Sequence, residues 1–331
     1  MHFCTLGMFI IDEFVFLDDA GNPIATQPIA PQIGGGGTYA SIGARLWLPP
    51  SQVGMIVDRG SDFPPSMESK LAEFGDIWLY RNQASGTTRA LNTYRGDHRS
   101  FDYITPRIRI TPRDLEGTPL QKPTTLHFIC SPTRASAIMS EVEQVSEWRP
   151  IVIYEPIPDR CVPEELSALT KVLPQIDILS PNAEEALSLL SLPLPPSKES
   201  IEEAASKLLK LGVGSEGKGA VLIRSGSMGV CVAFKNQPMR WVPAFWTSKD
   251  KDKIVDVTGA GNSFLGGLAA GLFLQNGDIY EASFHASIAA SFVIEQQGLP
   301  AVSTDNGTTL WNGDNPQRRL DELRQRVGID N

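Results

Sequence analysis

The segment best suited to chemistry runs from Asp256 to Phe264 and reads Asp-Val-Thr-Gly-Ala-Gly-Asn-Ser-Phe. A strand-like stretch leads into it, and the apolar segment Leu265 to Leu272 follows with helical character. Free backbone N–H groups at the start of such a helix favour an anion. Gly259 and Gly261 let the backbone approach a phosphate because they carry no Cβ. A tight turn packed with small residues has the same composition, so the turn alone leaves both interpretations open.

A second candidate segment follows the apolar strand predicted over Ile176 to Leu179. Asn182 and Glu185 offer amide and carboxylate oxygens, which are the ligands that Mg²⁺ prefers. An ordinary helix N-cap with an acid in the first turn gives the same spacing. On its own, this pair is more typical of a helix start than of a metal site.

A third candidate segment begins where the predicted strand Ala220 to Arg224 ends. Arg224 is followed by Gly226 and Gly229, so a flexible glycine turn comes directly after a cation. The guanidinium has the planar fork that binds phosphate through two N–H groups. An arginine at a strand end that simply faces solvent is the more frequent case.

The N-terminal half contains a four-glycine loop, Gly34 to Gly37. Gly35-x-Gly37-x-x-Ala40, with Asp58 about 20 residues later, fits the dinucleotide-binding fingerprint. An NAD(P)-dependent oxidoreductase is therefore one alternative. The residues before the loop count against it, because Pro28 and Pro31 make a poor central strand.

The elements around these segments predict an α/β fold. Short apolar strands alternate with amphipathic helices from Leu126 to Arg224, which favours a parallel sheet covered by helices on both faces. Phe3 to Phe16 is predicted to be one strand, with Ile24 to Ile33 running back beside it. Thr87 to Tyr103 reads as a hairpin around a Gly96-Asp97 turn. We expect these early strands to form a small second sheet over the main one.

Together these segments resemble the ribokinase-like, PfkB-type carbohydrate and nucleoside kinases from about Phe3 to Gly298. The family signature Asp-x-Thr-Gly-Ala-Gly-Asp, followed by a small residue and Phe, departs at one position only, Asn262. The resemblance is nearest to a fungal, maintenance-of-killer-like branch, in which the turn also reads Gly-Asn-Ser-Phe. It implies a three-layer αβα sandwich with a mainly parallel sheet and a small β lid. It also implies one domain over residues 1–331, with lid strands from about 10–33 and 87–112.

The resemblance also implies roles for individual residues. An anion hole for the ATP phosphates falls on Gly259, Ala260 and Gly261, and the catalytic base position on Asn262. Nucleotide contacts fall on Asn182, Arg224, Gly226 and Gly229. Glu185 would hold Mg²⁺ through water, and Asp256 with Thr258 would bind a monovalent cation such as K⁺. Substrate contacts fall on Asp12, Gly36, Gly37 and Thr38 or Tyr39, because the asparagine that binds sugar hydroxyls in the family is missing.

Asn262 divides the functional expectation in two. An amide has no useful basicity, although it can orient a hydroxyl by accepting its hydrogen bond. Phosphoryl transfer depends mainly on positioning and charge stabilisation. The first hypothesis is therefore a weak ATP-dependent kinase acting on a hydroxyl of a small sugar- or nucleoside-like metabolite. The second is a pseudokinase that binds nucleotide or metabolite and acts through a protein partner.

Composition limits the other function classes. The formal charge is −9 and Lys and Arg do not cluster, so we expect no nucleic-acid partner. The apolar run Phe264 to Leu274 is too short to span a bilayer, and the N-terminal segment has acids where a signal peptide would not. Four scattered cysteines fit reduced packing residues in a cytoplasmic protein. A lid sheet often pairs with a second copy, so a homodimer is a further expectation.

Overall fold

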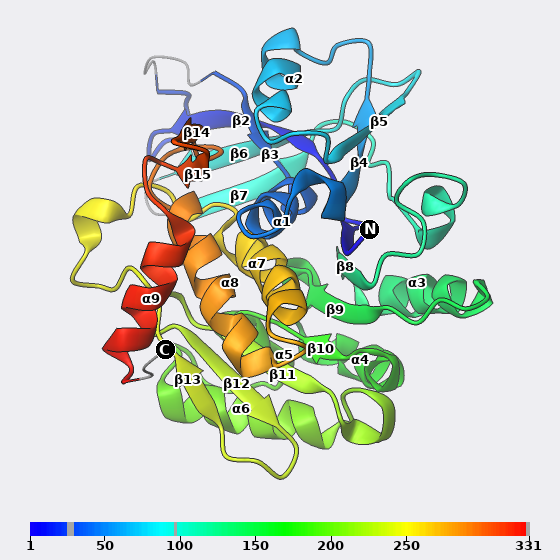
Figure 1. The fold of residues 1–331 in the computed structure, drawn as a ribbon, viewed down its shortest axis with the longest axis vertical. Coiled ribbons are helices and arrows are strands. Elements are labelled where there is room, and N and C mark those ends of the chain that lie inside the picture. Colours follow the sequence, from blue (N-terminus) through cyan, green and yellow to red (C-terminus); the bar gives the residue numbers. More distant parts are fainter. Residues whose placement is uncertain (25–29, 96–97, 329–331) are drawn as a thin grey trace.

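The computed structural model describes residues 1–24, 30–95 and 98–328. Its main feature is a nine-stranded sheet in the order β13-β12-β11-β10-β9-β8-β1-β4-β5 (Figure 1). The strands from β5 to β11 run parallel, whereas β12 and β13 form an antiparallel edge. The strands of this sheet are β1 Phe3–Thr5, β4 Val53–Arg59, β5 Trp78–Asn82, β8 Thr125–Cys130, β9 Ile151–Pro156, β10 Ile178–Leu179, β11 Ala220–Arg224, β12 Val230–Phe234 and β13 Arg240–Val242. The predicted mainly parallel sheet is confirmed.

Helices cover both faces of this sheet, as Figure 1 shows. One face carries α1 Gly36–Arg45, α2 Pro65–Ala72, α7 Ala260–Leu274, α8 Ile279–Val293 and α9 Pro316–Arg326. The other carries α3 Pro132–Gln144, α4 Leu166–Val172, α5 Ala183–Leu189 and α6 Lys198–Lys210. Successive side chains of a strand point to opposite faces, so Leu222 lies in one buried core and Ile223 in the other. The fold is therefore the predicted three-layer αβα sandwich. Within the described ranges, no helix has both the length and the apolar character that crossing a membrane requires.

The early strands form a separate four-stranded sheet, the lid sheet, in the order β3-β2-β6-β7. Its strands are β2 Ile10–Leu17, β3 Gln32–Gly34, β6 Arg89–Arg95 and β7 His98–Tyr103. In Figure 1 this sheet lies beside the start of α1, at one end of the main sheet. The expected small second sheet is present. The predicted Gly96-Asp97 turn, and residues 25–29 of the predicted second strand, lie outside the described residues.

The prediction of one strand from Phe3 to Phe16 is wrong. β1 ends at Thr5 in the main sheet and β2 begins at Ile10 in the lid sheet. The chain leaves the main sheet at Gly7, where an added Cβ would lie 2.6 Å from the backbone nitrogen of Gly37. This close approach brings the end of β1 against the start of α1. A continuous apolar run conceals the break, because β1 and the first three residues of β2 are all buried.

The C-terminal segment from Asn306 to Pro316, which the sequence indicates is a polar turn region, also contains a strand. β14 Val302–Asp305 pairs with β15 Thr308–Trp311 in a two-stranded sheet. Trp311 is buried against Phe74, with ring centroids 5.8 Å apart. This hairpin anchors the segment between α8 and α9.

Candidate active site

The N-terminus of α7 is built to leave backbone donors free. Gly259 is the N-cap residue in the left-handed conformation, with φ of +77°, and no side chain caps the helix. Among the described residues, the N–H groups of Gly261 and Asn262 have no backbone acceptor. Such uncapped groups, at the positive end of the helix dipole, favour an anion. A Cβ added to Gly259 would overlap the ring of Tyr39, so glycine is required here by both conformation and space.

The glycine loop that starts α1 lies directly beside this turn. A Cβ on Gly36 would stand 3.2 Å from Nδ2 of Asn262. Along the two helices, Gly43 lies against the backbone of Ser263 and Gly266 against that of Ala40. Glycines at these crossings allow α1 and α7 to approach closely. The expected substrate loop and the expected anion hole are therefore brought together, with Asn262 between them.

Asn262 is held by a buried carboxylate that the sequence analysis missed. Its Nδ2 donates to Oε2 of Glu155 at 2.8 Å. Glu155 lies at the end of β9 and is 7% exposed. This hydrogen bond fixes which way the amide points and leaves Oδ1 of Asn262 as its acceptor atom. The available signal was an acid that follows the apolar run Ile151 to Tyr154, at the strand edge where ligands bind in α/β sheets.

Glu155 is also contacted by two basic side chains. Nη2 of Arg224 lies 2.7 Å from its Oε1, and Nε2 of His127 lies 3.7 Å from its Oε2. Thr5 hydrogen-bonds to the other ring nitrogen of His127 at 3.0 Å, which orients the imidazole. Burial works to raise the pKa of Glu155, but Arg224 and His127 outweigh it and hold this pKa below its usual value. Glu155 is therefore a buried, ionised carboxylate that accepts the hydrogen bond of the Asn262 amide.

Arg224 points into the site, and the solvent-facing alternative is wrong. Its side chain is 11% exposed. Besides Glu155, Nη2 donates to the carbonyl of Ser180 at 3.0 Å and lies 3.7 Å from Oε2 of Glu185. A Cβ added to Gly261 would overlap Nη1, so the guanidinium lies against the start of α7. Arg224 therefore joins the two buried acids to the predicted anion hole.

Asn182 and Glu185 form the helix start that their spacing allows. Oδ1 of Asn182 accepts from the backbone N–H of Glu185 at 2.8 Å, and Oε2 of Glu185 accepts from that of Asn182 at 2.7 Å. This reciprocal pair is a capping box. A β-bridge between Asn182 and Arg224 places the helix start at the site. Burial raises the pKa of Glu185 to about 7, with Arg224 opposing that shift.

These side chains do not fit a Mg²⁺ ion held by the protein. One oxygen each of Asn182 and Glu185 is used by the capping box, and the guanidinium of Arg224 is the cation beside Glu185. In the part of the chain that the structure describes, no three His, Cys, Asp or Glu side chains gather as metal ligands. Direct ligation of Mg²⁺ by these side chains therefore finds no support in the donor set, and the expected contact of Glu185 with Mg²⁺ through water stays a prediction.

The predicted monovalent-cation residues lie just before α7. Oδ1 of Asp256 accepts from the backbone N–H of Thr258 at 2.9 Å, which closes a local turn. The backbone N–H groups of Val255 and Asp256 both bond to the carbonyl of Ile294 and tie the loop to α8. The K⁺ assignment stays a prediction.

The predicted substrate residues occupy different environments. Asp12, on lid strand β2, is 6% exposed, and its carboxylate fills the space above Gly34 at the glycine loop. Thr38 is fully buried, and its hydroxyl donates to the carbonyl of Gly34 at 2.8 Å, so that group serves α1 itself. Tyr39 packs its ring over Gly259. Of these side chains, Asp12 is the one placed between the lid and the loop.

The glycines after β11 adopt the conformations that a tight turn requires. Gly226 and Gly229 have φ of +55° and +91° and flank a short 3₁₀ turn. Gly226 faces open space, since an added Cβ would meet no atom within 4 Å. Both glycines follow Arg224 at the carboxyl end of β11. Their predicted place at a nucleotide is consistent with this position.

The glycine loop does not have the structural context of a dinucleotide-binding fingerprint. The strand before it, β3, is at the edge of the lid sheet, whereas the fingerprint requires a strand of the parallel sheet. Asp58 does end a central strand, but its carboxylate is held by Arg81 at 2.6 Å. The oxidoreductase alternative therefore lacks the strand of the parallel sheet that must precede its glycine loop.

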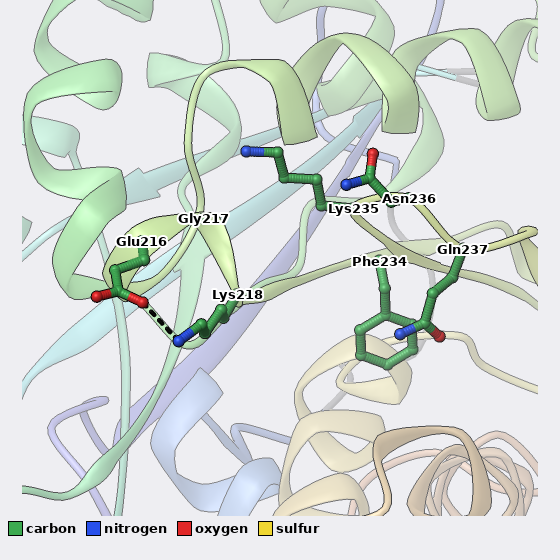
Figure 2. Close-up of a pocket in the computed structure, with 7 residues that line it drawn as sticks. All are labelled: Glu216, Gly217, Lys218, Phe234, Lys235, Asn236 and Gln237. Carbon is green, nitrogen blue, oxygen red and sulfur yellow. Dashed lines mark ion pairs between the residues drawn. The ribbon is translucent and has the colours of Figure 1, made fainter.

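A surface hollow elsewhere is not the candidate site. Figure 2 shows it lined by Glu216 to Lys218 and by Phe234 to Gln237. Phe234 pairs with Ala220 at the start of β11, whereas Arg224 pairs with Val230 at its other end. The hollow is therefore at the opposite edge of the sheet from Arg224 and α7.

Comparison with known proteins agrees with this fold. The family described as pfkB family carbohydrate kinase matches residues 134–305. An uncharacterized protein of Schizosaccharomyces pombe is 37% identical, with 97% of this chain and 92% of that protein covered. Protein MAK32 of Saccharomyces cerevisiae is 35% identical, with 93% and 88% covered. The structure of Arabidopsis thaliana ribokinase complexed with ribose and ATP has a TM-score of 0.64 at 20% identity, covering 89% of this chain and 93% of that one.

The sandwich, the lid and the glycine turn at α7 define a ribokinase-like carbohydrate kinase fold. The chain belongs to the pfkB family of carbohydrate kinases. Within that family it belongs to a fungal branch that includes MAK32, as the sequence resemblance predicts.

Proposed function

We propose that this protein transfers the γ-phosphoryl group of ATP to a hydroxyl of a small sugar- or nucleoside-like metabolite, at a low rate. The main support is the position of Asn262 between the free N–H groups of α7 and the glycine loop at Gly36. A hydroxyl held at the loop would face a phosphate held at α7. The family and the ribose and ATP bound to Arabidopsis ribokinase support the same substrate classes.

Each part of the site has a role in this reaction. The N–H groups of Gly261 and Asn262 would stabilise charge on the transferred phosphoryl group. Oδ1 of Asn262 would accept the hydrogen bond of the attacking hydroxyl and orient it, while Glu155 holds the amide in that orientation. Asp12 would bind a second hydroxyl of the substrate at the lid. The amide takes no proton, so the reaction lacks the roughly 10²–10⁴-fold that a general base typically contributes.

The second candidate function is nucleotide or metabolite binding without turnover. The protein would then act by binding a protein partner. The same residue favours it, because Asn262 removes the base while the anion-binding turn is kept. Pairing of two copies through the lid sheet stays a prediction under either function.

The test is a combined binding and transfer assay. Calorimetry would measure ATP binding, and mass spectrometry would detect phosphorylated acceptors from a panel of sugars and nucleosides. Transfer to an acceptor supports the kinase. ATP binding with no transfer to any acceptor supports the second candidate. The absence of ATP binding would contradict the kinase and the nucleotide-binding form of the second candidate, because both place phosphate at α7.

A further inference from the structure

Arg224 places a positive charge between the two buried acids of this site. Its guanidinium lies between the carboxylates of Glu155 and Glu185, at 2.7 and 3.7 Å, and against Gly261 at the start of α7. A guanidinium stays protonated at any physiological pH. One fixed positive charge therefore already lies between the two buried acids, immediately beside the predicted phosphate position.

The guanidinium also has a donor left for a ligand. Nη2 is used by Glu155 and Ser180. Nε has no acceptor among the described residues, but it is closed off from solvent. The donor left for a ligand is therefore Nη1, the guanidinium nitrogen nearest Gly261, which makes no hydrogen bond to any described residue. The planar guanidinium fork suits phosphate oxygens, and charge-assisted hydrogen bonds of this kind are stronger than neutral ones.

A divalent ion at the same place would meet an unfavourable environment. Glu185 is 7% exposed and one of its oxygens is used by the capping box. A metal ion beside it would also face the positive charge of Arg224 at short range. The acids that would attract the ion are thus already paired.

We propose that Arg224 takes the role of a protein-held divalent cation, so that ATP binds at α7 without Mg²⁺. This inference rests on the proposed nucleotide site and adds its cofactor requirement. It predicts that the wild-type affinity for ATP is nearly the same in excess MgCl₂ and in excess EDTA. It also predicts that a variant without the guanidinium binds ATP more weakly in EDTA than in MgCl₂.

The experiment is calorimetric titration of ATP into the full chain in both buffers. The wild type should bind with affinities within about threefold of each other, far less than the roughly tenfold or greater loss expected when a charged hydrogen-bonding partner is removed. Arg224→Gln should lose about tenfold or more in EDTA and regain part of that loss in MgCl₂. Arg113→Gln, which removes a charge from a side chain that is 65% exposed, should change neither affinity.

Two outcomes distinguish a failure of this inference from a failure of the proposed function. Wild-type binding that requires Mg²⁺ would overturn this inference while leaving the nucleotide site intact. No ATP binding in either buffer would overturn the proposed function itself. If Arg224→Gln does not fold, Arg224→Lys keeps the charge without the fork and should stay insensitive to EDTA. A Lys variant that binds ATP only with Mg²⁺ would count against the inference.

Discussion

The side-chain nitrogen of Asn262 lies 2.8 Å from Oε2 of Glu155, across 107 positions of sequence. This contact links the unusual residue at the base position to a buried acid at the end of β9. Glu155 accepts the hydrogen bond that only an amide, and not a carboxylate, can donate. The two residues are therefore complementary, and a change at one of them should be judged together with the other.

Asn262→Asp alone should not give an efficient kinase. It would place a second carboxylate within hydrogen-bonding distance of Glu155, and two such groups cannot both ionise without a large cost. Arg224 and His127 favour the ionised form of Glu155, so the new aspartate would take up the proton and would be a poor base at neutral pH. We expect a lowered melting temperature and little gain in phosphoryl transfer, measured by thermal unfolding and by product formation.

The exchanged pair, Asn262→Asp with Glu155→Gln, should behave differently. The amide then donates from position 155 to an ionised carboxylate at position 262, and the total charge of the wild type is kept. Its transfer rate should exceed that of Asn262→Asp by roughly tenfold or more, within the ~10²–10⁴-fold range of general-base catalysis. If Asn262→Asp alone were as fast as the exchanged pair, Glu155 would not prevent the new aspartate from acting as a base.

Glu155→Gln by itself should destabilise the protein strongly. It leaves the buried guanidinium of Arg224 without its nearest carboxylate, and breaking a buried ion pair from one side costs about 3–5 kcal/mol. Urea unfolding measures this loss. The matched control is Glu203→Gln, which removes the exposed pair with Lys207 and should cost about 1 kcal/mol or less. Equal losses for the two variants would mean that the Glu155 pair contributes no more than a surface pair.

Gly259→Ala tests the turn at α7 against a glycine with a similar backbone. Gly277 has φ of +88° but nothing within 4 Å of an added Cβ, whereas at Gly259 the Cβ would overlap Tyr39. Gly277→Ala should cost about 1–2 kcal/mol from the left-handed conformation alone. Gly259→Ala should cost about 1–3 kcal/mol more from overpacking, and it should also weaken ATP binding. Equal unfolding free energies for the two variants would argue that Tyr39 moves aside freely.

The sequence predicted those parts of the site that are formed by residues close together in the chain. The turn from Asp256 to Asn262 and the capping box of Asn182 and Glu185 are local, so spacing was sufficient. The contact of Glu155 with Asn262 depends on how β9 and α7 are placed by the fold. The position of Glu155 after the apolar run of β9 indicates a site residue, but no local pattern identifies Asn262 as its partner.

Arg224 and the early strands show the same limit. The direction of Arg224 depends on the acids of two other elements, so its sequence context favoured solvent. The break after β1 depends on the contact of Gly7 with Gly37, which only the folded chain makes. The periodicity that predicted the parallel sheet was sound because it repeats along a long stretch of sequence. Single long-range contacts leave no such repeat.

The last prediction concerns His285, a buried residue of α8 outside the site. Its ring lies against Trp47, with centroids 4.6 Å apart, and Nδ1 lies 3.3 Å from the carbonyl of Glu281. Burial lowers the pKa of His285 to about 4, with a smaller contribution from the charge of Arg324. The unfolded chain binds this proton below about pH 6.5 and the folded protein only below about pH 4. Folding stability should therefore fall as the pH falls between those values.

The size of this loss is bounded by the shift of the pKa, at about 1.4 kcal/mol for each unit, or about 3 kcal/mol in total by pH 4. Urea unfolding of the wild type and of His285→Gln, measured at a series of pH values, isolates it. The other titrating groups are common to both proteins, so they cancel in the difference. The advantage of the wild type over His285→Gln should be constant above about pH 7 and shrink steadily toward pH 4. A difference that does not change with pH would mean that His285 takes up its proton in the folded protein as readily as in the unfolded chain.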